Sequence, residues 1–456
     1  MIAGRRRRLG QRLRAYRGGP TTVGWVDDVV GIGLLGCGTV GGALVGLLNT
    51  EADVIAARTG MRLEVRRVAV RDLDAARRRV PSLDPDVFTT DAVAVVADPT
   101  VQVVVEVMGG VDEARSLVLA ALDAHKPVVT ANKALLASHG PELHAAAAAA
   151  NVDLLFEAAV AGGIPLVRPL RESLLGEPIR RIMGIVNGTT NYILTRMTEE
   201  GASYDEALAD AQRLGYAEAD PSADVGGADA AAKAAILATL AFGVEVHLDE
   251  VHTEGIEGIS ASDIAFASAN GQVIKLLAIA EAVGEGRVAV RVHPALVPRD
   301  HPLASVRLSF NAVFVEGDAV GQLMFYGPGA GGGPTASAVL GDLIDAAANR
   351  RQGSSARLGV LVPADLVPVD ELRSGFYVEV QVADEPGVLA TVAGVFGANG
   401  VSISSMVQEG HDHEASLAFV THTALEADVQ ATISALDDLG SVRRVGSVIR
   451  LVGDQG

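Results

Sequence analysis

Apolar residues change their spacing along this chain, and the changes mark its predicted elements. An uncharged run over residues 29–48, VVGIGLLGCGTVGGALVGLL, starts as an apolar stretch of strand length. After it, apolar residues recur at helical spacing, at Leu44, Leu47, Leu48 and Ile55. The run is also long enough for a membrane span, but seven of its twenty residues are glycine, which costs about 1 kcal/mol each inside a lone helix. Two interpretations remain at this point: a membrane helix, or a strand, glycine turn and helix.

The glycines of this run have the spacing of a dinucleotide-binding turn, G-x-G-x-x-G, at Gly36, Gly38 and Gly41. The first glycine allows a tight turn, the second lets the backbone approach a pyrophosphate, and the third lets helix and strand pack closely. The helix N-terminus offers unpaired N–H groups to the phosphates. The candidate cofactor-binding residues of this turn are Gly36, Cys37, Gly38, Thr39, Val40 and Gly41.

A second strand, predicted over residues 63–73, ends in Arg71-Asp72. In such folds an acid at this place binds a free ribose 2′-hydroxyl, whereas a neighbouring arginine favours a 2′-phosphate. Both are present, so the choice between NAD and NADP stays open, with NADP preferred and Arg71 as its candidate ligand. The alternative is that Arg71 is only a solvated strand end.

Further strand–helix units follow over residues 101–110 and 125–140, which predicts a parallel, doubly wound sheet. A ligand should lie at the carboxyl ends of its strands, where Gly109 and Lys133 fall. A membrane span cannot also be the first strand of such a sheet. The pattern therefore favours a nucleotide-binding domain.

The middle of the chain carries a polar turn and an acidic segment. Thr189 lies in NGTTN, which is either part of a site or only a turn with a helix cap. Glu218, Asp224 and Asp229 then precede Lys233 in GYAEADPSADVGGADAAAK. Asp229 and Lys233 are four residues apart and so share a helix face.

That helix face continues into Ile236, Leu237 and Leu240, so it points inward. Carboxylates beside a lysine form a plausible site for a small substrate with an ammonium group, and the lysine can donate a proton to an oxygen that gains negative charge. The alternative is an ordinary surface ion pair.

Composition restricts the class of protein. The 456 residues carry a net charge of −19, which argues against nucleic acid or an anionic membrane as the main partner. The first 17 residues hold seven arginines, and residues 1–28 are predicted to be a disordered tail or to follow a start codon assigned too early. The single cysteine, Cys37, excludes a disulfide framework and a cysteine-based zinc site, and it suits a cytoplasmic location.

The end of the chain predicts a small separate domain. Residues 351–375 have the composition of a linker, and strict alternation follows at Phe376, Val378, Val380 and Val382. The later pattern completes a βαββαβ order over residues 376–456. His411 and His413 are expected in a solvated hairpin loop rather than a metal site, since no further ligands lie near them in the sequence.

Several stretches together resemble the homoserine dehydrogenase family of the long bacterial type. They include VVVEVMGG, VVTANKALL, FEAAVAGGIP, GIVNGTTNYIL, the acidic segment and LMFYGPGAGGGPTASAVLGD, in the expected order from residue 29 to 452. The resemblance implies a Rossmann-type nucleotide-binding domain (29–152), an α+β substrate-binding and dimerisation domain (153–326), a return segment (327–350), and an ACT regulatory domain (376–456).

The resemblance also implies an activity: the reversible, NAD(P)H-dependent reduction of L-aspartate 4-semialdehyde to L-homoserine, in threonine and methionine biosynthesis. The residue matching the family's proton donor is Lys233. The implied substrate-binding residues are Glu218, Asp224, Asp229, Lys133, Thr189 and Tyr216, and Lys133 also lies against the cofactor.

A monovalent cation such as Na⁺ is implied at FEAAVAGGI, through Glu157, Val160, Gly162 and Ile164. The ACT domain implies an amino-acid effector, with threonine expected, bound at the D-x-P-G-V-L turn over residues 384–389. A dimerisation module without a ligand is the alternative. A homodimer or homotetramer is expected.

Two other functions compete with this one. A phosphorylating semialdehyde dehydrogenase needs a thiolate nucleophile, and the only candidate, Cys37, lies inside the phosphate-binding turn. A sensor that keeps both small-molecule sites but has lost catalysis would differ in an assay of NADPH oxidation with the semialdehyde.

Overall fold

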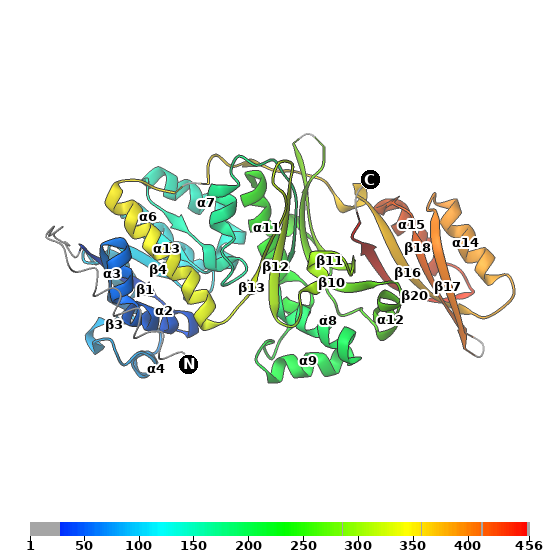
Figure 1. Ribbon diagram of the computed structural model, residues 1–456, viewed down its shortest axis with the longest axis horizontal. Helices are drawn as coiled ribbons and strands as arrows, with labels where there is room; N and C mark the ends of the chain where they lie inside the picture. Colours follow the sequence, from blue (N-terminus) through cyan, green and yellow to red (C-terminus); the bar gives the residue numbers. More distant parts are fainter. Residues whose placement is uncertain (1–27, 285, 357, 412–413, 454–456) are drawn as a thin grey trace, which may run out of the picture.

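The computed structural model arranges the chain as three parts in a row (Figure 1). It describes residues 28–453 apart from 285, 357, 412 and 413. The arginine-rich segment predicted as a disordered tail, residues 1–28, therefore lies outside the described residues except for Asp28. His413 and the side chain of His411 also lie outside them.

The first part is built on a six-stranded parallel sheet in the order β3-β2-β1-β4-β5-β6. Its strands are β1 (Asp28–Leu35), β2 (Met61–Ala69), β3 (Phe88–Thr89), β4 (Val103–Glu106), β5 (Val128–Thr130) and β6 (Leu154–Leu155). Its helices are α2 (Thr39–Thr50), α3 (Ala52–Thr59), α4 (Leu73–Arg79), α5 (Ala92–Ala97), α6 (Asp112–Asp123), α7 (Lys133–Ala150) and the returning α13 (Gly332–Gln352). This confirms the predicted Rossmann-type domain.

The run over residues 29–48 forms β1, the glycine turn and α2, as the glycine spacing predicted. Strand β1 is buried on both faces because it lies between β2 and β4 with helices above and below. Gly36 has a φ of +97°, and a Cβ on Gly41 would lie 2.5 Å from the carbonyl oxygen of Gly36. Only glycine fits these two positions, so the turn brings the N-terminus of α2 close to the sheet.

The second part is an antiparallel sheet on which helices α8, α11 and α12 pack, while α9 packs on α8 and α10 packs on α8 and α11 (Figure 1). Its strands run in the order β13-β12-β7-β10-β11. They are β7 (Ile179–Ile185), β10 (Gln272–Ala282), β11 (Arg287–Pro298), β12 (Phe310–Gly317) and β13 (Gly321–Pro328), and the short strand β9 (His252–Thr253) pairs with β11. The short strand β8 (Val244–Glu245) lies outside this sheet. The helices are α8 (Gly188–Glu200), α9 (Tyr204–Arg213), α10 (Ser222–Val225), α11 (Ala228–Phe242) and α12 (Ala261–Ala269).

The third part has the predicted βαββαβ order. It consists of β16 (Arg373–Ala383), α14 (Val388–Ala398), β17 (Ile403–His411), β18 (Glu414–Thr421), α15 (Glu426–Asp437) and β20 (Val442–Leu451), with a two-residue strand β19 (Ala424–Leu425) before α15. The alternating residues of β16 that were predicted to share a face are all buried in one core: Phe376, Val378, Val380 and Val382. The opposite face of β16 is also covered, because Tyr377 packs on Phe266 of α12 with ring centroids 4.4 Å apart.

The second and third parts share one sheet. Strand β20 pairs in parallel with β11, so the order continues β11-β20-β16-β18-β17. The span predicted as a linker is also attached to the second part, since β14 (Val362–Pro363) pairs with β8 and β15 (Asp365–Leu366) pairs with β11. The small C-terminal part is therefore fixed to the middle part by strand pairing.

Among the described residues, no single helix has both the length and the apolar character needed to cross a membrane. The pair formed by α2 and α3 meets the test of length and composition only when the two are taken together, across a bend of 69°.

Candidate active site

A cavity of about 800 Å³ lies where the nucleotide-binding part meets the second part. The start of α7 contributes Lys133, and the turn between β7 and α8 contributes residues 186–189. The acidic segment forms another wall with residues 214–232, and residues 309–311 and 328–331 close the remaining side. Segments far apart in the chain thus converge on one hollow.

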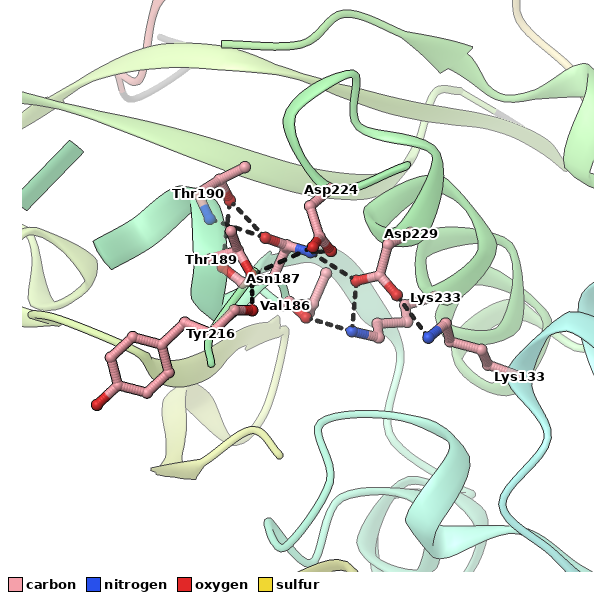
Figure 2. Close-up of polar contacts among 9 residues, drawn as sticks. All are labelled: Lys133, Val186, Asn187, Thr189, Thr190, Tyr216, Asp224, Asp229 and Lys233. Carbon is pink, nitrogen blue, oxygen red and sulfur yellow. Dashed lines mark hydrogen bonds and ion pairs between the residues drawn. The ribbon is translucent and has the colours of Figure 1, made fainter. Parts of the chain in front are cut away.

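Two lysines meet at one carboxylate inside this cavity (Figure 2). Nζ of Lys233 lies 2.7 Å from Oδ2 of Asp229, and Nζ of Lys133 lies 2.8 Å from Oδ1. Lys233 also donates to the carbonyl oxygen of Val186 at 2.6 Å. An ammonium has three N–H groups, so these contacts leave Lys233 one donor for a ligand oxygen.

The charge of Asp229 is strongly favoured in this setting. Burial raises the pKa of its carboxyl, but the charges of Lys233 and Lys133, and hydrogen bonds from both, outweigh burial and hold the pKa well below its usual range. The exposed fraction of the Lys233 side chain is 12%, against 44% for Lys133. Lys233 is therefore the more shielded of the two ammonium groups.

The NGTTN turn ties the acids together. Nδ2 of Asn187 donates to Oδ1 of Asp224 at 2.6 Å and to Oδ2 of Asp229 at 2.8 Å, while its Oδ1 caps α8 by accepting from the N–H of Thr190. Thr189 donates to the carbonyl oxygen of Tyr216 at 2.6 Å and lies 3.3 Å from Asp224. The turn thus acts both as a helix cap and as part of the site, so the two interpretations of its sequence are compatible.

The remaining substrate-binding candidates lie on the outer side of the cavity. Glu218 lines it and is exposed. Tyr216 also lines it, but Figure 2 shows its ring directed away from Lys233, and it packs at 5.0 Å on the ring of Tyr192. Glu218 is thus more accessible to a ligand than Asp224 or Asp229, which are partly buried.

The cofactor-binding candidates gather at the carboxyl end of the parallel sheet. Gly38 has open space around it, and Gly332, the first residue of α13, lies against Thr39, the first residue of α2. Gly109 follows β4 and has a φ of +74°. Strand order predicts that these residues lie together, and in the structure they follow the adjacent strands β1 and β4.

The turn after β2 bears on the choice of cofactor. The strand predicted over residues 63–73 ends at Ala69, so Arg71 and Asp72 lie in the turn between β2 and α4. Arg71 is exposed, whereas the carboxylate of Asp72 caps α4 by accepting from the N–H of Ala75 at 2.9 Å. Arg79, the last residue of α4, reaches the glycine turn after β1, where its guanidinium donates to the carbonyl oxygen of Cys37 at 3.0 Å. Arg71 and Asp72 are thus both exposed, and the carboxylate of Asp72 is engaged as a helix cap.

Cys37 is an unsuitable nucleophile. Its side chain is buried, and burial raises the pKa of the thiol more than the nearby charge of Arg79 lowers it. A thiolate is the reactive form of cysteine, so this position disfavours the chemistry of a phosphorylating semialdehyde dehydrogenase.

The predicted cation loop is buried behind the cavity. The carboxylate of Glu157 accepts from the backbone N–H groups of Leu166, Val167 and Arg168. Ala161 and Gly162 both have positive φ, and the N–H of Gly163 donates to the carbonyl oxygen of Pro328 at 3.2 Å. The loop therefore supports the turn over residues 328–331 that lines the cavity.

One buried hydrogen-bond network, around Lys275 and Asn191, was not predicted from the sequence. Lys275 donates to Oδ1 of Asn191 at 2.9 Å and to the carbonyl oxygen of Val306 at 2.6 Å, and Asn191 in turn donates to the carbonyl oxygens of Leu308 and Phe310. It fixes the loop that carries Ser309 and Phe310 into the cavity. A lone lysine in an apolar strand gives no local signal of such a role.

Three family models match this chain. They are described as homoserine dehydrogenase, NAD binding domain, over residues 36–157; homoserine dehydrogenase, over residues 165–344; and ACT domain, over residues 376–441. Together they follow the three parts of the fold.

Named relatives match nearly the whole chain. The homoserine dehydrogenase of Corynebacterium glutamicum is 52% identical over 433 residues, which cover 94% of this chain and 96% of that protein. The crystal structure of a homoserine dehydrogenase from Thiobacillus denitrificans is similar with a TM-score of 0.89 and 41% identity, covering 93% and 98% of the two chains. A hyperthermophilic archaeal homoserine dehydrogenase in complex with NADPH matches 70% of this chain and 98% of its own, with a TM-score of 0.58 and 33% identity.

Proposed function

The chain belongs to the homoserine dehydrogenase family, oxidoreductases that act on a CH–OH group, and we propose that it reduces L-aspartate 4-semialdehyde reversibly to L-homoserine in the cavity around Asp229, with NADPH as the preferred cofactor. The pathways served would be threonine and methionine biosynthesis. The observation that carries the proposal is the contact of Lys133 and Lys233 with the two oxygens of one buried carboxylate, beside a nucleotide-binding fold.

Lys233 is the proposed proton donor. Its Nζ is held by Asp229 and by the carbonyl oxygen of Val186, so its remaining N–H has a defined direction. In the reduction this group donates a proton to the aldehyde oxygen, and in the oxidation it receives the proton of the alcohol. When bound, the nicotinamide cofactor supplies or accepts the hydride.

The acids divide into two proposed roles. Both oxygens of Asp229 are engaged by lysines, so its main role is to orient Lys133 and Lys233 rather than to bind the substrate alone. Glu218 is exposed in the cavity, and with Asp224 it binds the substrate ammonium group. Thr189 keeps Asp224 in place, and the backbone at Tyr216 lines the pocket.

Replacing Lys233 tests the proton-donor role. Lys233→Met should lower kcat for NADPH oxidation with aspartate semialdehyde by about 10²–10⁴-fold, the usual contribution of a positioned acid. NADPH binding, followed by nucleotide fluorescence, should remain. Lys126→Met is the matched control, since its Nζ also donates to backbone carbonyls but lies away from the cavity. A Lys233→Met enzyme with nearly normal kcat would refute the assignment.

The cofactor would lie along the turn from Gly36 to Gly41 and past Gly109, with Lys133 between it and the substrate. Arg71 is exposed in the turn after β2 while Asp72 serves as a helix cap, which supports a 2′-phosphate and hence NADP over NAD.

The loop of Glu157, Val160, Gly162 and Ile164 is proposed to hold a monovalent cation such as Na⁺. Among the described residues no three His, Cys, Asp or Glu side chains come together to hold a metal ion, and the proposed donors are the backbone carbonyl oxygens of this loop. Hard oxygen donors beside a carboxylate suit such an ion. Its contribution would be to keep the loop bent against residues 328–331. Kinetics with Na⁺ replaced by a bulky organic cation measure it.

The C-terminal ACT domain is proposed to bind threonine as a feedback inhibitor. A cavity of about 380 Å³ borders the turn over residues 384–389, together with Gln408 and Leu417. Helix α14 begins at Val388 within this turn, and the positive end of its dipole would favour a ligand carboxylate there.

A homodimer or homotetramer in the cytoplasm is proposed. Strand β13 lies at the outer edge of the larger sheet and exposes Tyr326, which stacks on Phe310. A single free, buried cysteine suits a reducing compartment. Light scattering of the purified chain measures the oligomeric state.

A further inference from the structure

A buried arginine connects the ACT domain with the middle part. Arg450 of β20 is 4% exposed. Its Nε and Nη2 donate to the two carboxylate oxygens of Glu426, the first residue of α15, at 2.8 and 2.6 Å. Its Nη1 and Nη2 donate to the two oxygens of Glu254, which follows β9, at 2.9 and 2.8 Å. One guanidinium thus binds one carboxylate from each part.

Glu254 is firmly held as an anion. Burial raises its pKa, but hydrogen bonds from His252 and Arg450 and the charge of Arg450 outweigh burial and leave the pKa at about 2. Its backbone N–H donates to the carbonyl oxygen of Val292 on β11 at 2.8 Å. Both its side chain and its backbone are therefore fixed.

The residues around Glu254 pack directly on the acidic segment that lines the cavity, at Val225 and Gly227. The N–H of Ile256 donates to the carbonyl oxygen of Val225 at 2.8 Å. A Cβ on Gly255 would lie 2.3 Å from that same oxygen, so the two backbones are in contact there. Gly227, with a φ of +90°, lies against Thr253 and the carbonyl oxygen of Glu254.

Asp224 and Asp229 lie on either side of this contact. Asp224 is adjacent to Val225 at the end of α10, and Asp229 is two residues after Gly227 in the first turn of α11. The backbone that carries the substrate-site carboxylates thus has Glu254 and its neighbours as its support. A shift of Glu254 would displace both carboxylates, because tightly packed backbone cannot move alone.

We propose that Arg450 and Glu254 are positioning residues for the substrate site, which hold the segment over residues 224–229 in its binding geometry from the ACT side. The proposal rests on the substrate-binding role proposed above for that segment. Since Glu426 belongs to the ACT domain, the same arginine gives a displacement of α15 a direct route to the substrate carboxylates. Contact with the substrate itself is not required of either residue.

Charge-neutral variants of the two glutamates test the proposal in the full chain. Glu254→Gln should raise KM for homoserine about tenfold, since it weakens a bidentate, charge-assisted contact, with KM for NADP⁺ changed less than about twofold. Glu426→Gln should shift KM for homoserine in the same direction by a smaller factor. KM for homoserine should rise less in Arg450→Lys than in Arg450→Met, because lysine keeps the positive charge.

Glu316→Gln is the matched control. Glu316 pairs with Arg181 between β12 and β7 of the same sheet, at 2.6 Å and largely buried, but contacts neither the 253–256 segment nor the cavity. Its KM for homoserine should equal that of the wild type, whatever happens to its melting temperature. A Glu254→Gln enzyme that loses thermal stability but keeps the wild-type KM for homoserine would overturn the proposal, since the network would then be only structural.

The two proposals fail in different ways. A normal kcat in Lys233→Met would refute the proposed chemistry and leave the KM of Glu254→Gln as informative as before. An equal rise of both KM values in Glu254→Gln would refute the specific link to the substrate segment while the proton-donor role stands.

Discussion

Lys133 and Lys233 come from different parts of the fold, yet their ammonium groups contact opposite oxygens of one carboxylate (Figure 2). Lys133 opens α7 of the nucleotide-binding part, and Lys233 lies in α11 of the middle part. Asp229 thus links the nucleotide-binding part and the middle part through two ion pairs.

Removing the negative charge of Asp229 should impair catalysis more than cofactor binding. Asp229→Asn leaves two neighbouring ammonium groups without their shared counterion, so they repel each other and lose their orientation. We expect kcat to fall by about 10²-fold or more, with the dissociation constant of NADPH nearly unchanged. The exposed Asp205→Asn serves as the control. A kcat within about threefold of the wild type would mean that other contacts orient the lysines.

The cofactor preference should depend on Arg71. Arg71→Ala removes the exposed charge in the turn after β2, so KM for NADP⁺ should rise about tenfold or more, while KM for NAD⁺ changes little. Arg78→Ala on α4 is the control for a lost surface charge. Steady-state kinetics with both nucleotides measure the effect, and equal losses with both would show that Arg71 does not read the 2′-phosphate.

Threonine inhibition should depend on the turn before α14. Asp384→Ala alters the wall of the cavity of about 380 Å³ without touching the cavity at Asp229. We expect the threonine concentration for half inhibition to rise about tenfold, with kcat unchanged. Asp437→Ala, at the end of α15, is the control. Absence of threonine inhibition in the wild type would refute threonine as the effector.

Lys275 should make the free energy of unfolding depend on pH in the alkaline range. Burial lowers its pKa to about 8, whereas a lysine in an unfolded chain titrates near about 10.4. Between these values the unfolded chain binds more protons, so the free energy of unfolding rises with pH there, by about 3 kcal/mol in total. Lys275→Met should lack this rise. Urea unfolding from pH 7.5 to 10.5 measures both proteins, and parallel curves would contradict the lowered pKa.

Much of the fold could be predicted because the signals are local. The G-x-G-x-x-G spacing required a strand, turn and helix around Gly36, and the alternation from Phe376 to Val382 required a strand with one core face. Asp229 and Lys233 could be paired from sequence because four residues make one helical turn. In each case the period of the backbone alone brings the residues together.

Contacts between segments far apart in the chain do not follow from the repeat of a helix or strand. Nothing in the sequence brings Lys133 to Asp229, fixes residues 309–311 beside the NGTTN turn through Lys275, or joins β20 to β11. The composition of residues 351–375 is that of a linker, yet Arg450 and Tyr377 attach the ACT domain to the middle part. The sequence by itself determined the order of the elements and the chemical groups available to each. Only the tertiary structure decided which of them meet, because strand pairing and packing across the chain depend on all the surfaces at once.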